Sequence, residues 1–345
     1  MIFMNYKTCW LTVNRACNLR CKWCYARSTN YLPSDDMNLD KAKQIIKICK
    51  DLNIKHIVLI GGEPTLYKHL FEVIDCCHEN NISCGIVTNG LLCKNPSFVE
   101  RLKNHKIKSI SLSLKGENKE KFEKLTGKDL FNDTKEAIKC CIKHDIKVAV
   151  SMVLTKDNIN TFIEGIKTML DLGVSNFHFS FCYDFDMEMD HSRYLTIHNP
   201  KQLIKDFMKI YPKLDEITKH KFSFQNGLPL CLWEDEDIGL LKKRGQISTV
   251  CQLLSKSGLI FDTNGYVIPC NAMPSIKLGL LNKDFSTTTE LLDYMEKLEL
   301  KKIYQKLCGV PDSRCLKCNK LVNCGGGCVC QWTNYSFDEL INQNK

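Results

Sequence analysis

Apolar positions along the first half of the chain follow two alternating patterns. Short runs rich in β-branched and aromatic residues predict strands, and longer stretches with apolar residues three or four positions apart predict helices. The predicted strands are Thr8–Thr12, His56–Ile60, Ser83–Thr88, Ser109–Leu114, Lys147–Leu154 and Asn176–Cys182. The predicted helices between them are Leu39–Asp51, Leu66–Glu79, Ser97–Leu102, Thr134–Lys143 and Thr161–Leu170.

This alternation favours repeated right-handed βα units on one parallel sheet, an α/β fold. A continuously apolar strand such as His56–Ile60 is typical of a parallel sheet that is covered on both faces. Six units, rather than the eight of a closed barrel, predict an open, partial (β/α)6 barrel over residues 1–183. Ligands of such sheets bind at the carboxyl ends of the strands, so the residues that follow each strand form the candidate site.

The pattern changes in the second half of the chain. Residues 184–250 contain acidic clusters and prolines, with one predicted helix from Pro200 to Ile210, and are interpreted as a bridge. Residues 251–335 are rich in cysteine and glycine and predict a small separate domain. Residues 336–345 form a polar tail.

The composition limits the classes of protein to which this chain can belong. The hydrophobic fraction of 44% and the charged fraction of 25% are ordinary for a globular chain. No run reaches the roughly 18 apolar residues that a membrane span requires, and the N-terminus lacks a basic stretch leading into an apolar core. We therefore expect a cytoplasmic protein with no membrane partner. In that reducing compartment, 21 cysteines indicate metal binding rather than disulfides.

The net charge of +9 is spread over lysine-rich helix faces, without an arginine-rich block. A solvated lysine surface accounts for this pattern better than the steering of an acidic peptide or a tRNA-like partner, so a nucleic acid partner is not expected.

Three cysteines follow the first predicted strand within eight residues, and Cys17, Cys21 and Cys24 can all turn toward one point on a tight loop. A structural zinc site takes four ligands and closes its shell. Three thiolates leave one iron of a four-iron cluster without a protein ligand, so another molecule can bind there.

The arrangement Cys-x3-Cys-x2-Cys followed by an aromatic residue resembles the signature of the radical S-adenosylmethionine (SAM) enzymes. The resemblance implies that Cys17, Cys21 and Cys24 hold a [4Fe-4S] cluster, with the amino and carboxylate groups of SAM at the fourth iron. It also implies that Trp23 and Tyr25 flank the adenine, and that the fold is a partial (β/α)6 barrel.

The turn Gly61-Gly62-Glu63-Pro64 ends the second strand and resembles the family's motif for the methionine amino group. Two glycines let the backbone approach a ligand closely and adopt a positive φ. Glu63 can accept a hydrogen bond from an ammonium group, and Pro64 fixes the exit of the turn.

Further SAM contacts are expected at the next strand ends. Thr88 and Asn89 end the third strand, Ser111 and Ser113 alternate on the fourth and so face the same side, and Ser151 lies on the fifth. Related family members often have Ser-x-Asp-Gly on the fourth strand, where this chain has Ser113-Leu114-Lys115-Gly116. The arginine that usually follows is missing, with Lys121 or Lys124 as the substitute.

A second cysteine pattern lies near the C-terminus. It reads Cys315-x2-Cys318-x5-Cys324-x3-Cys328, with Cys251 and Cys270 upstream, and resembles the SPASM domain that carries auxiliary [4Fe-4S] clusters in peptide-modifying radical SAM enzymes. Zinc is the physical alternative.

The resemblance implies an inner cluster on Cys251, Cys270 and Cys328 and an outer one on Cys315, Cys318 and Cys324. The family's final cysteine is missing, and Cys330 is its nearest stand-in. For the fourth inner ligand, Cys231 and Cys308 are candidates, or the site is open.

Cys182 ends the sixth strand at the expected mouth of the cavity. It is either a packed strand-end residue or a hydrogen-atom donor that quenches a substrate radical, as in peptide epimerases.

The resemblance predicts reductive cleavage of SAM to a 5′-deoxyadenosyl radical, which abstracts hydrogen from a ribosomally made peptide. The product would be a thioether, a carbon–carbon crosslink or an epimerised residue. Alternatives are an anaerobic sulfatase maturase that forms formylglycine, with Asp184 or Asp186 as base, a haem or quinone cofactor biosynthesis enzyme, and a non-catalytic iron–sulfur carrier.

The predicted function implies three partners. They are a peptide or protein substrate, an electron donor such as flavodoxin or ferredoxin, and a separate leader-binding protein. The last is expected because the predicted barrel starts almost at residue 1, unless the bridge binds the leader.

Overall fold

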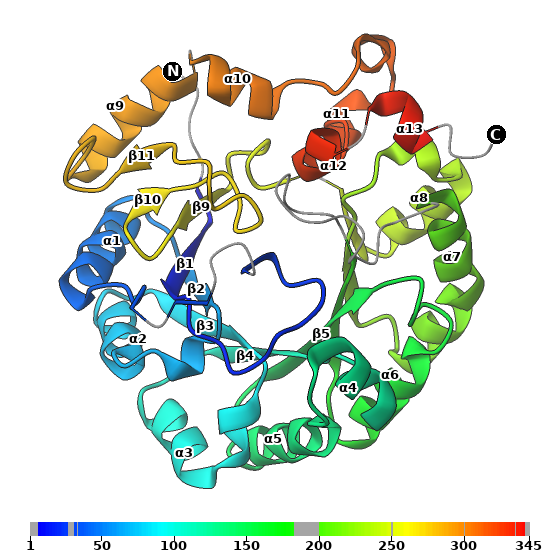
Figure 1. The fold of residues 1–345 in the computed structure, drawn as a ribbon, viewed down its shortest axis with the longest axis horizontal. Coiled ribbons are helices and arrows are strands. Elements are labelled where there is room, and N and C mark those ends of the chain that lie inside the picture. The colour runs from blue at the N-terminus through cyan, green and yellow to red at the C-terminus, as the bar shows by residue number, and fades with distance from the viewer. Residues whose placement is uncertain are drawn as a thin grey trace.

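The computed structural model describes residues 6–26, 31–32, 34–182, 200–249, 251–299, 301–334 and 336–341. In this part of the chain, helices form a ring around a curved sheet, and the segment after the first strand curves across the middle of the ring (Figure 1).

The predicted alternation of strands and helices is confirmed. The strands are β1 (Thr8–Asn14), β2 (His56–Gly61), β3 (Ser83–Thr88), β4 (Ser109–Ser113), β5 (Val148–Leu154) and β6 (Asn176–Phe181). Each pairs in parallel with the next. The helices between them are α1 (Leu39–Asp51), α2 (Leu70–Glu79), α3 (Pro96–Asn104), α4 (Lys119–Thr126), α5 (Phe131–Lys143) and α6 (Phe162–Asp171), with short 3₁₀ helices at Pro64–Leu66 and Leu91–Lys94. The pattern did not predict α4.

The sheet extends beyond these six strands at both edges. The strands β7 (Phe222–Gln225) and β8 (Ile247–Ser248) continue it in parallel after β6. At the other edge β9 (Gly258–Phe261) pairs in parallel with β1, followed by antiparallel β10 (Tyr266–Val267) and β11 (Gly279–Leu280). The segment interpreted as a bridge and the cysteine-rich segment therefore both contribute strands to the barrel sheet.

Helix α7 (Pro200–Ile217) is longer than predicted, because it continues through Pro212. Proline removes one backbone hydrogen bond inside a helix. Tyr211 and Leu214, which flank it, are buried, and this packing holds the helix together. A 3₁₀ turn at Leu230–Leu232 and helix α8 (Asp235–Lys243) complete this region.

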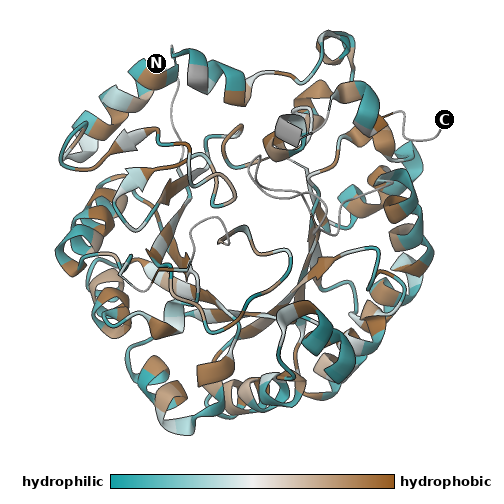
Figure 2. Ribbon diagram, viewed as in Figure 1, coloured by the Kyte–Doolittle hydropathy of each residue, from teal (hydrophilic) through white to brown (hydrophobic). Residues whose placement is uncertain are grey.

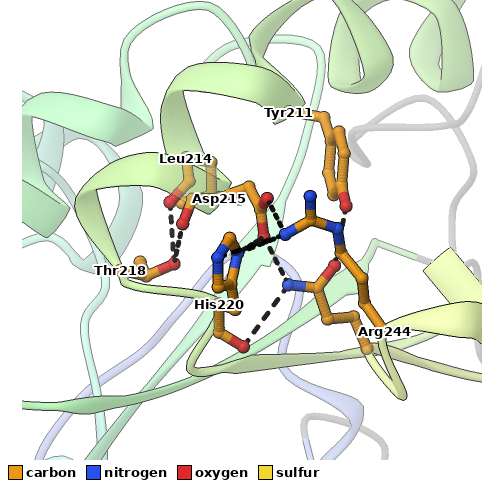
Figure 3. Close-up of polar contacts among 7 residues, drawn as sticks. Tyr211, Leu214, Asp215, Thr218, His220 and Arg244 are labelled. Atoms are coloured by element: carbon orange, nitrogen blue, oxygen red, sulfur yellow. Dashed lines mark hydrogen bonds and ion pairs between the residues drawn. The ribbon is translucent and has the colours of Figure 1, made fainter. Parts of the chain in front are cut away.

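A buried polar cluster joins α7 to β8 (Figure 3). The Asp215 carboxylate forms an ion pair with Arg244 at 2.6 Å and accepts hydrogen bonds from His220 at 2.9 Å and Gln246 at 2.6 Å. Tyr211 donates to the Gln246 carbonyl at 2.8 Å. Burial acts to raise the pKa of Asp215, but the hydrogen bonds from Gln246 and His220 and the Arg244 charge lower it below its ordinary value.

Strand side chains alternate between the helix-facing core and the inside of the barrel. On β4, Ile110 and Leu112 are buried under the helices, while Ser111 and Ser113 face inward. The apolar sides of the helices turn toward the sheet (Figure 2). Each fully buried side chain of this kind stabilises the fold by roughly 1.5–3 kcal/mol. Because these side chains lie on the helix side of the sheet, the inner face of the barrel is left for ligands.

The C-terminal region adds α9 (Thr288–Glu299), α10 (Lys302–Cys308), a 3₁₀ helix at Ser313–Lys317, α11 (Leu321–Cys324), α12 (Val329–Asn334) and α13 (Phe337–Ile341). Among the residues that the structure describes, no helix combines the length and the apolar character that crossing a bilayer requires.

Candidate active site

The cysteine loop after β1 gathers its three thiols as predicted. Cys21 is buried in a small apolar cluster with Leu19 and Trp23, and Cys17 and Cys24 pack against that cluster. The Cys17 sulfur accepts a hydrogen bond from the Leu19 amide at 3.4 Å. Burial is the main cause that raises the pKa of Cys17 to about 11; the charges of Glu63, Cys24 and Cys21 act in the same direction, and the hydrogen bond from the Leu19 amide opposes them. Three cysteines on one loop supply the three protein ligands of a [4Fe-4S] cluster and leave its fourth iron open, and a bound cluster would offset the raised pKa of Cys17 by binding it as a thiolate. The residues therefore fit the cluster.

A hydrogen-bond network joins the ends of the first three strands. Glu63 is 1% exposed, and its carboxylate accepts from the Thr65 amide at 3.1 Å, the Thr88 hydroxyl at 2.5 Å and the Asn89 amide at 2.8 Å. Asn89 in turn donates to the Asn18 side chain in the cysteine loop at 2.7 Å. The predicted residues Glu63, Thr88 and Asn89 are thus brought together, and the network holds the loop over the barrel.

The structure gives the two glycines a packing role that the sequence did not predict. A Cβ at Gly61 would collide with Asn14, and one at Gly62 would collide with the carbonyls of Arg15 and Ala16. Both glycines are therefore required for close packing against the end of β1. The φ angle of neither residue falls among the positive values.

A cavity of 270 Å³ lies on the inner face of the barrel beneath the cysteine loop. Its lining includes Trp23, Ser113, Lys115 and Ser151. The Ser151 hydroxyl donates to that of Ser113 at 3.5 Å, whereas Ser111 lies one pleat away and outside this lining. These groups can contact the adenine, sugar and carboxylate of SAM.

Two of the predicted residues, Tyr25 and Pro64, stabilise the turn that follows β2. The Tyr25 hydroxyl donates to the Gly61 carbonyl at 3.5 Å, so this side chain braces the turn. Pro64 is buried at the start of its 3₁₀ helix.

Lys115 is the cation that this pocket presents. Burial raises the pKa of Cys21, and the nearby Lys115 charge opposes that shift. Lys121 is occupied elsewhere, since its ammonium donates to the Asp157 carbonyl at 2.9 Å, and Lys124 is exposed. Lys115, which stands where related members have the aspartate of Ser-x-Asp-Gly, therefore places a positive charge in this pocket.

A second, larger cavity of 480 Å³ lies between the barrel and the C-terminal cysteines. Its lining includes Trp10 from β1, Asn271, and three of the predicted inner ligands, Cys251, Cys270 and Cys328.

The two cavities share the residues His178, Phe179, Ser180 and Gln225. His178 forms a hydrogen bond with the Ser223 hydroxyl at 2.6 Å, and partial desolvation of its ring inside the barrel lowers its pKa. Sequence reasoning missed His178 and Gln225. The signal was present in the alternation of Phe177, His178 and Phe179 along β6, because every second residue of a strand faces the same side.

The C-terminal cysteines divide into two groups. Cys330 is buried and shares hydrogen bonds with Cys270 and Cys328, so it belongs to the inner group and is not the stand-in for an outer ligand. Cys270 also accepts from the Ala272 amide at 3.4 Å. Cys308 lies apart from this group, hydrogen-bonded to Tyr304.

The outer group contains Cys315, Cys318 and Cys324. The Cys318 amide donates to the Cys315 carbonyl at 3.1 Å, and the Cys324 sulfur accepts from the Leu230 amide at 3.2 Å. No three His, Cys, Asp or Glu side chains of the described chain converge on a position for a single metal ion. In a [4Fe-4S] cluster each thiolate binds a different iron, so the four sulfurs do not meet at one atom.

Cys182 is 3% exposed and packs with Leu19, Cys21 and Trp23, close to the cysteine loop. Asp184 and Asp186 lie outside the described residues.

Comparisons with known proteins agree with this geometry. Residues 11–169 match the model of the radical SAM superfamily. The chain is 27% identical over 300 residues to a GTP 3′,8-cyclase from Helicobacter pylori, covering 82% of this chain and 86% of that protein. It is 24% identical over 302 residues to an AdoMet-dependent heme synthase from Methanosarcina barkeri, covering 85% of each.

Among solved structures, Streptococcus suis SuiB bound to the precursor peptide SuiA superposes with a TM-score of 0.73 at 20% identity. The match covers 95% of this chain and 72% of SuiB, which has also been solved with S-adenosylmethionine. This likeness establishes the fold.

The family match falls on the strands that carry the cysteine loop, the glycine turn and the inward serines. Radical SAM proteins use a [4Fe-4S] cluster and SAM, and the candidate residues for both lie within the matched range. Residues 11–169 are therefore a radical SAM domain, and this protein is a radical SAM enzyme that uses a [4Fe-4S] cluster and S-adenosylmethionine.

Proposed function

We propose that this enzyme modifies a ribosomally made peptide, forming a thioether, a carbon–carbon crosslink or an epimerised residue. When bound, the cluster and SAM supply a 5′-deoxyadenosyl radical that abstracts hydrogen from the substrate. The barrel binds and orients the substrate and excludes water from the reacting groups.

The observation that carries this proposal is the chemistry of the 480 Å³ cavity. Apart from the proposed cluster ligands Cys251, Cys270 and Cys328, its polar lining consists of neutral amides and hydroxyls together with His178. Its apolar lining includes Trp10, Phe179 and Leu253. Neutral amide and hydroxyl groups match the donors and acceptors of a peptide backbone, and aromatic residues provide contact area for side chains.

The comparison with the GTP 3′,8-cyclase makes GTP a second candidate substrate. A triphosphate carries several negative charges and is normally held by arginine, lysine or a metal ion. Among the described residues, the 480 Å³ cavity has neither lysine nor arginine in its lining, and the smaller pocket has Lys115. The cavity therefore favours the peptide.

The likeness to SuiB with a precursor peptide bound also supports a peptide substrate. The similarity to the AdoMet-dependent heme synthase makes a haem precursor an alternative substrate. Formylglycine formation on a sulfatase is a further alternative reaction, which the test below includes.

The two cysteine groups support auxiliary clusters, on Cys251, Cys270 and Cys328 in the inner group and on Cys315, Cys318 and Cys324 in the outer one. Such clusters would accept an electron or hold the substrate. The proposal includes a flavodoxin- or ferredoxin-type electron donor, a separate leader-binding protein, and Cys182 as a hydrogen-atom donor.

The test is an anaerobic incubation of the reconstituted, reduced enzyme with SAM and the short peptide encoded beside its gene, with parallel samples containing GTP or a sulfatase peptide. The expected result is 5′-deoxyadenosine together with a peptide that has lost two hydrogens, or one that gains deuterium from D2O on epimerisation. A cyclised GTP product, or formylglycine in the sulfatase peptide, with an unchanged precursor peptide would contradict the proposal. Cys182→Ala with unchanged turnover and products would remove the hydrogen-donor role.

A further inference from the structure

The segment that precedes α8 packs directly against the loop carrying the outer cysteines. The Cys328 amide donates to the Gly227 carbonyl at 2.7 Å, and the Leu230 amide donates to the Cys324 sulfur at 3.2 Å. A Cβ at Gly327 would lie 3.0 Å from the Pro229 nitrogen, which shows how closely the two backbones approach.

Contacts on either side fix this arrangement. Lys320 forms an ion pair with Asp235 at the start of α8, and the Thr249 hydroxyl donates to the Asn323 carbonyl at 2.7 Å. In Figure 1, α11 and α12 lie on the same side of the ring as α8. The segment with Cys231 is therefore held beside the outer cysteines at several points.

Within this segment Leu230 and Leu232 are buried, and Cys231 between them is exposed. An apolar side chain on each side anchors the 3₁₀ turn and directs the intervening thiol away from the core. Cys231 directly follows Leu230, whose amide contacts the Cys324 sulfur at 3.2 Å, so the Cys231 thiol lies beside the outer group.

We propose that Cys231 completes a four-thiolate set with Cys315, Cys318 and Cys324, and that this set holds a closed [4Fe-4S] cluster on the outer side of the cysteine-rich region. The inference rests on the proposal that the C-terminal cysteines bind auxiliary clusters. It does not depend on the identity of the substrate.

The assignment explains two features of the chain. The outer group would otherwise have three cysteines, because Cys330 lies with Cys270 and Cys328. Lys320, whose ammonium is near Cys231 and Cys318, supplies a positive charge beside thiolates and a cluster that are together anionic. With a thiolate on each of its irons, the outer cluster would have no open position for substrate.

The test uses the full chain with Cys17, Cys21 and Cys24 all replaced by alanine, so that the only bound iron belongs to the auxiliary sites. After anaerobic reconstitution with iron and sulfide, Cys231→Ser in this background should lose about half of the auxiliary iron, or change its reduced EPR signal through oxygen ligation, because one of two clusters is affected. The matched control is Cys308→Ser, which should leave iron and signal unchanged. Thermal unfolding of both variants shows that they are folded.

A second measurement does not depend on a variant. In the cluster-loaded chain, Cys231 should resist iodoacetamide, and after the metal is removed with a chelator it should react readily because it is exposed. Equal labelling in both states, or an unchanged iron content and EPR signal in Cys231→Ser, would overturn the assignment. Zinc in place of iron, or no bound metal in the background chain, would overturn the auxiliary cluster itself, while the peptide assay of the intact enzyme would still judge the proposed function.

Discussion

The side-chain amide of Asn89 donates a hydrogen bond to the side-chain oxygen of Asn18 at 2.7 Å. Asn18 belongs to the cysteine loop and Asn89 to the end of β3, so this contact joins the cluster motif to the barrel. Through the Asn89 backbone amide it continues to Glu63, which is buried. The position of the three thiols therefore depends on residues well outside their motif.

The first prediction concerns this contact. Asn18→Ala, Asn89→Ala and the double variant should give a coupling energy of about 1 kcal/mol in urea unfolding, the usual value for a neutral hydrogen bond. Each single variant should also lose iron faster to a chelator, since the loop is less firmly held. Asn80→Ala, which removes a side-chain hydrogen bond to Cys76 on α2, is the control and should leave iron loss unchanged. A coupling energy of zero would show that the contact does not position the loop.

Replacing Glu63 by glutamine should be costly. Its carboxylate accepts from Thr65, Thr88 and Asn89, and the new amide would point a donor at one of those donors. A lost hydrogen bond to a buried charged group costs about 1.5–3 kcal/mol, so the free energy of unfolding should fall by that amount. The exposed Glu72→Gln on α2 should change stability by less than about 0.5 kcal/mol. Similar unfolding midpoints for the two variants would contradict the role of Glu63 as an organising acceptor.

Lys115→Met should weaken SAM binding. Lys115 lines the pocket beneath the cluster loop, where a carboxylate of SAM can pair with it. Loss of a charge-assisted hydrogen bond of about 1.5–3 kcal/mol corresponds to a roughly 10- to 150-fold rise in Kd, measured by calorimetry on the cluster-loaded protein. The exposed Lys124→Met is the matched control. Weaker SAM binding in Lys124→Met but not in Lys115→Met would contradict this assignment and would give the SAM contact to Lys124, as the sequence analysis suggested.

The Asp215 cluster predicts a pH-dependent stability. Because the folded pKa of Asp215 lies below its ordinary value of 3.8, its contribution is present above that pH and is lost as the pH falls through the folded pKa. Asp215→Asn should lower the unfolding free energy by about 2 kcal/mol at pH 7, and the difference from wild type should shrink below pH 4. Asp206→Asn, on the same helix, should show neither effect. A difference that stayed constant down to pH 3 would contradict this account.

The sequence predicted the fold where elements are long and periodic. The apolar runs of β2, β3 and β5 and the stripe of α1 are strong local signals, and their bounds agree with the structure. The strands β7 and β8 have four and two residues, so their pairing depends on tertiary packing and leaves no clear pattern.

The site was predictable to a similar extent. Spacing identified Cys17, Cys21 and Cys24, because their ligand geometry is local to one loop. The places of Cys231 and Cys330 were not predictable, because they depend on contacts between distant segments: the Leu230 amide meets the Cys324 sulfur across 94 positions of the sequence. The positive φ expected at Gly61 and Gly62 was wrong, and the collision of a Cβ with Asn14 could not be foreseen without the fold.

Of the proposals above, peptide binding next to SAM in the 480 Å³ cavity decides the function of this enzyme. The most direct measurement compares 5′-deoxyadenosine formation by the reduced, reconstituted enzyme with the adjacent-gene peptide, with GTP and with neither. The account predicts that the peptide alone raises the rate, with a matching amount of modified peptide, and that His178→Ala raises the KM for peptide while uncoupled SAM cleavage persists. Stimulation by GTP with conversion to a cyclised nucleotide, and none by the peptide, would contradict it.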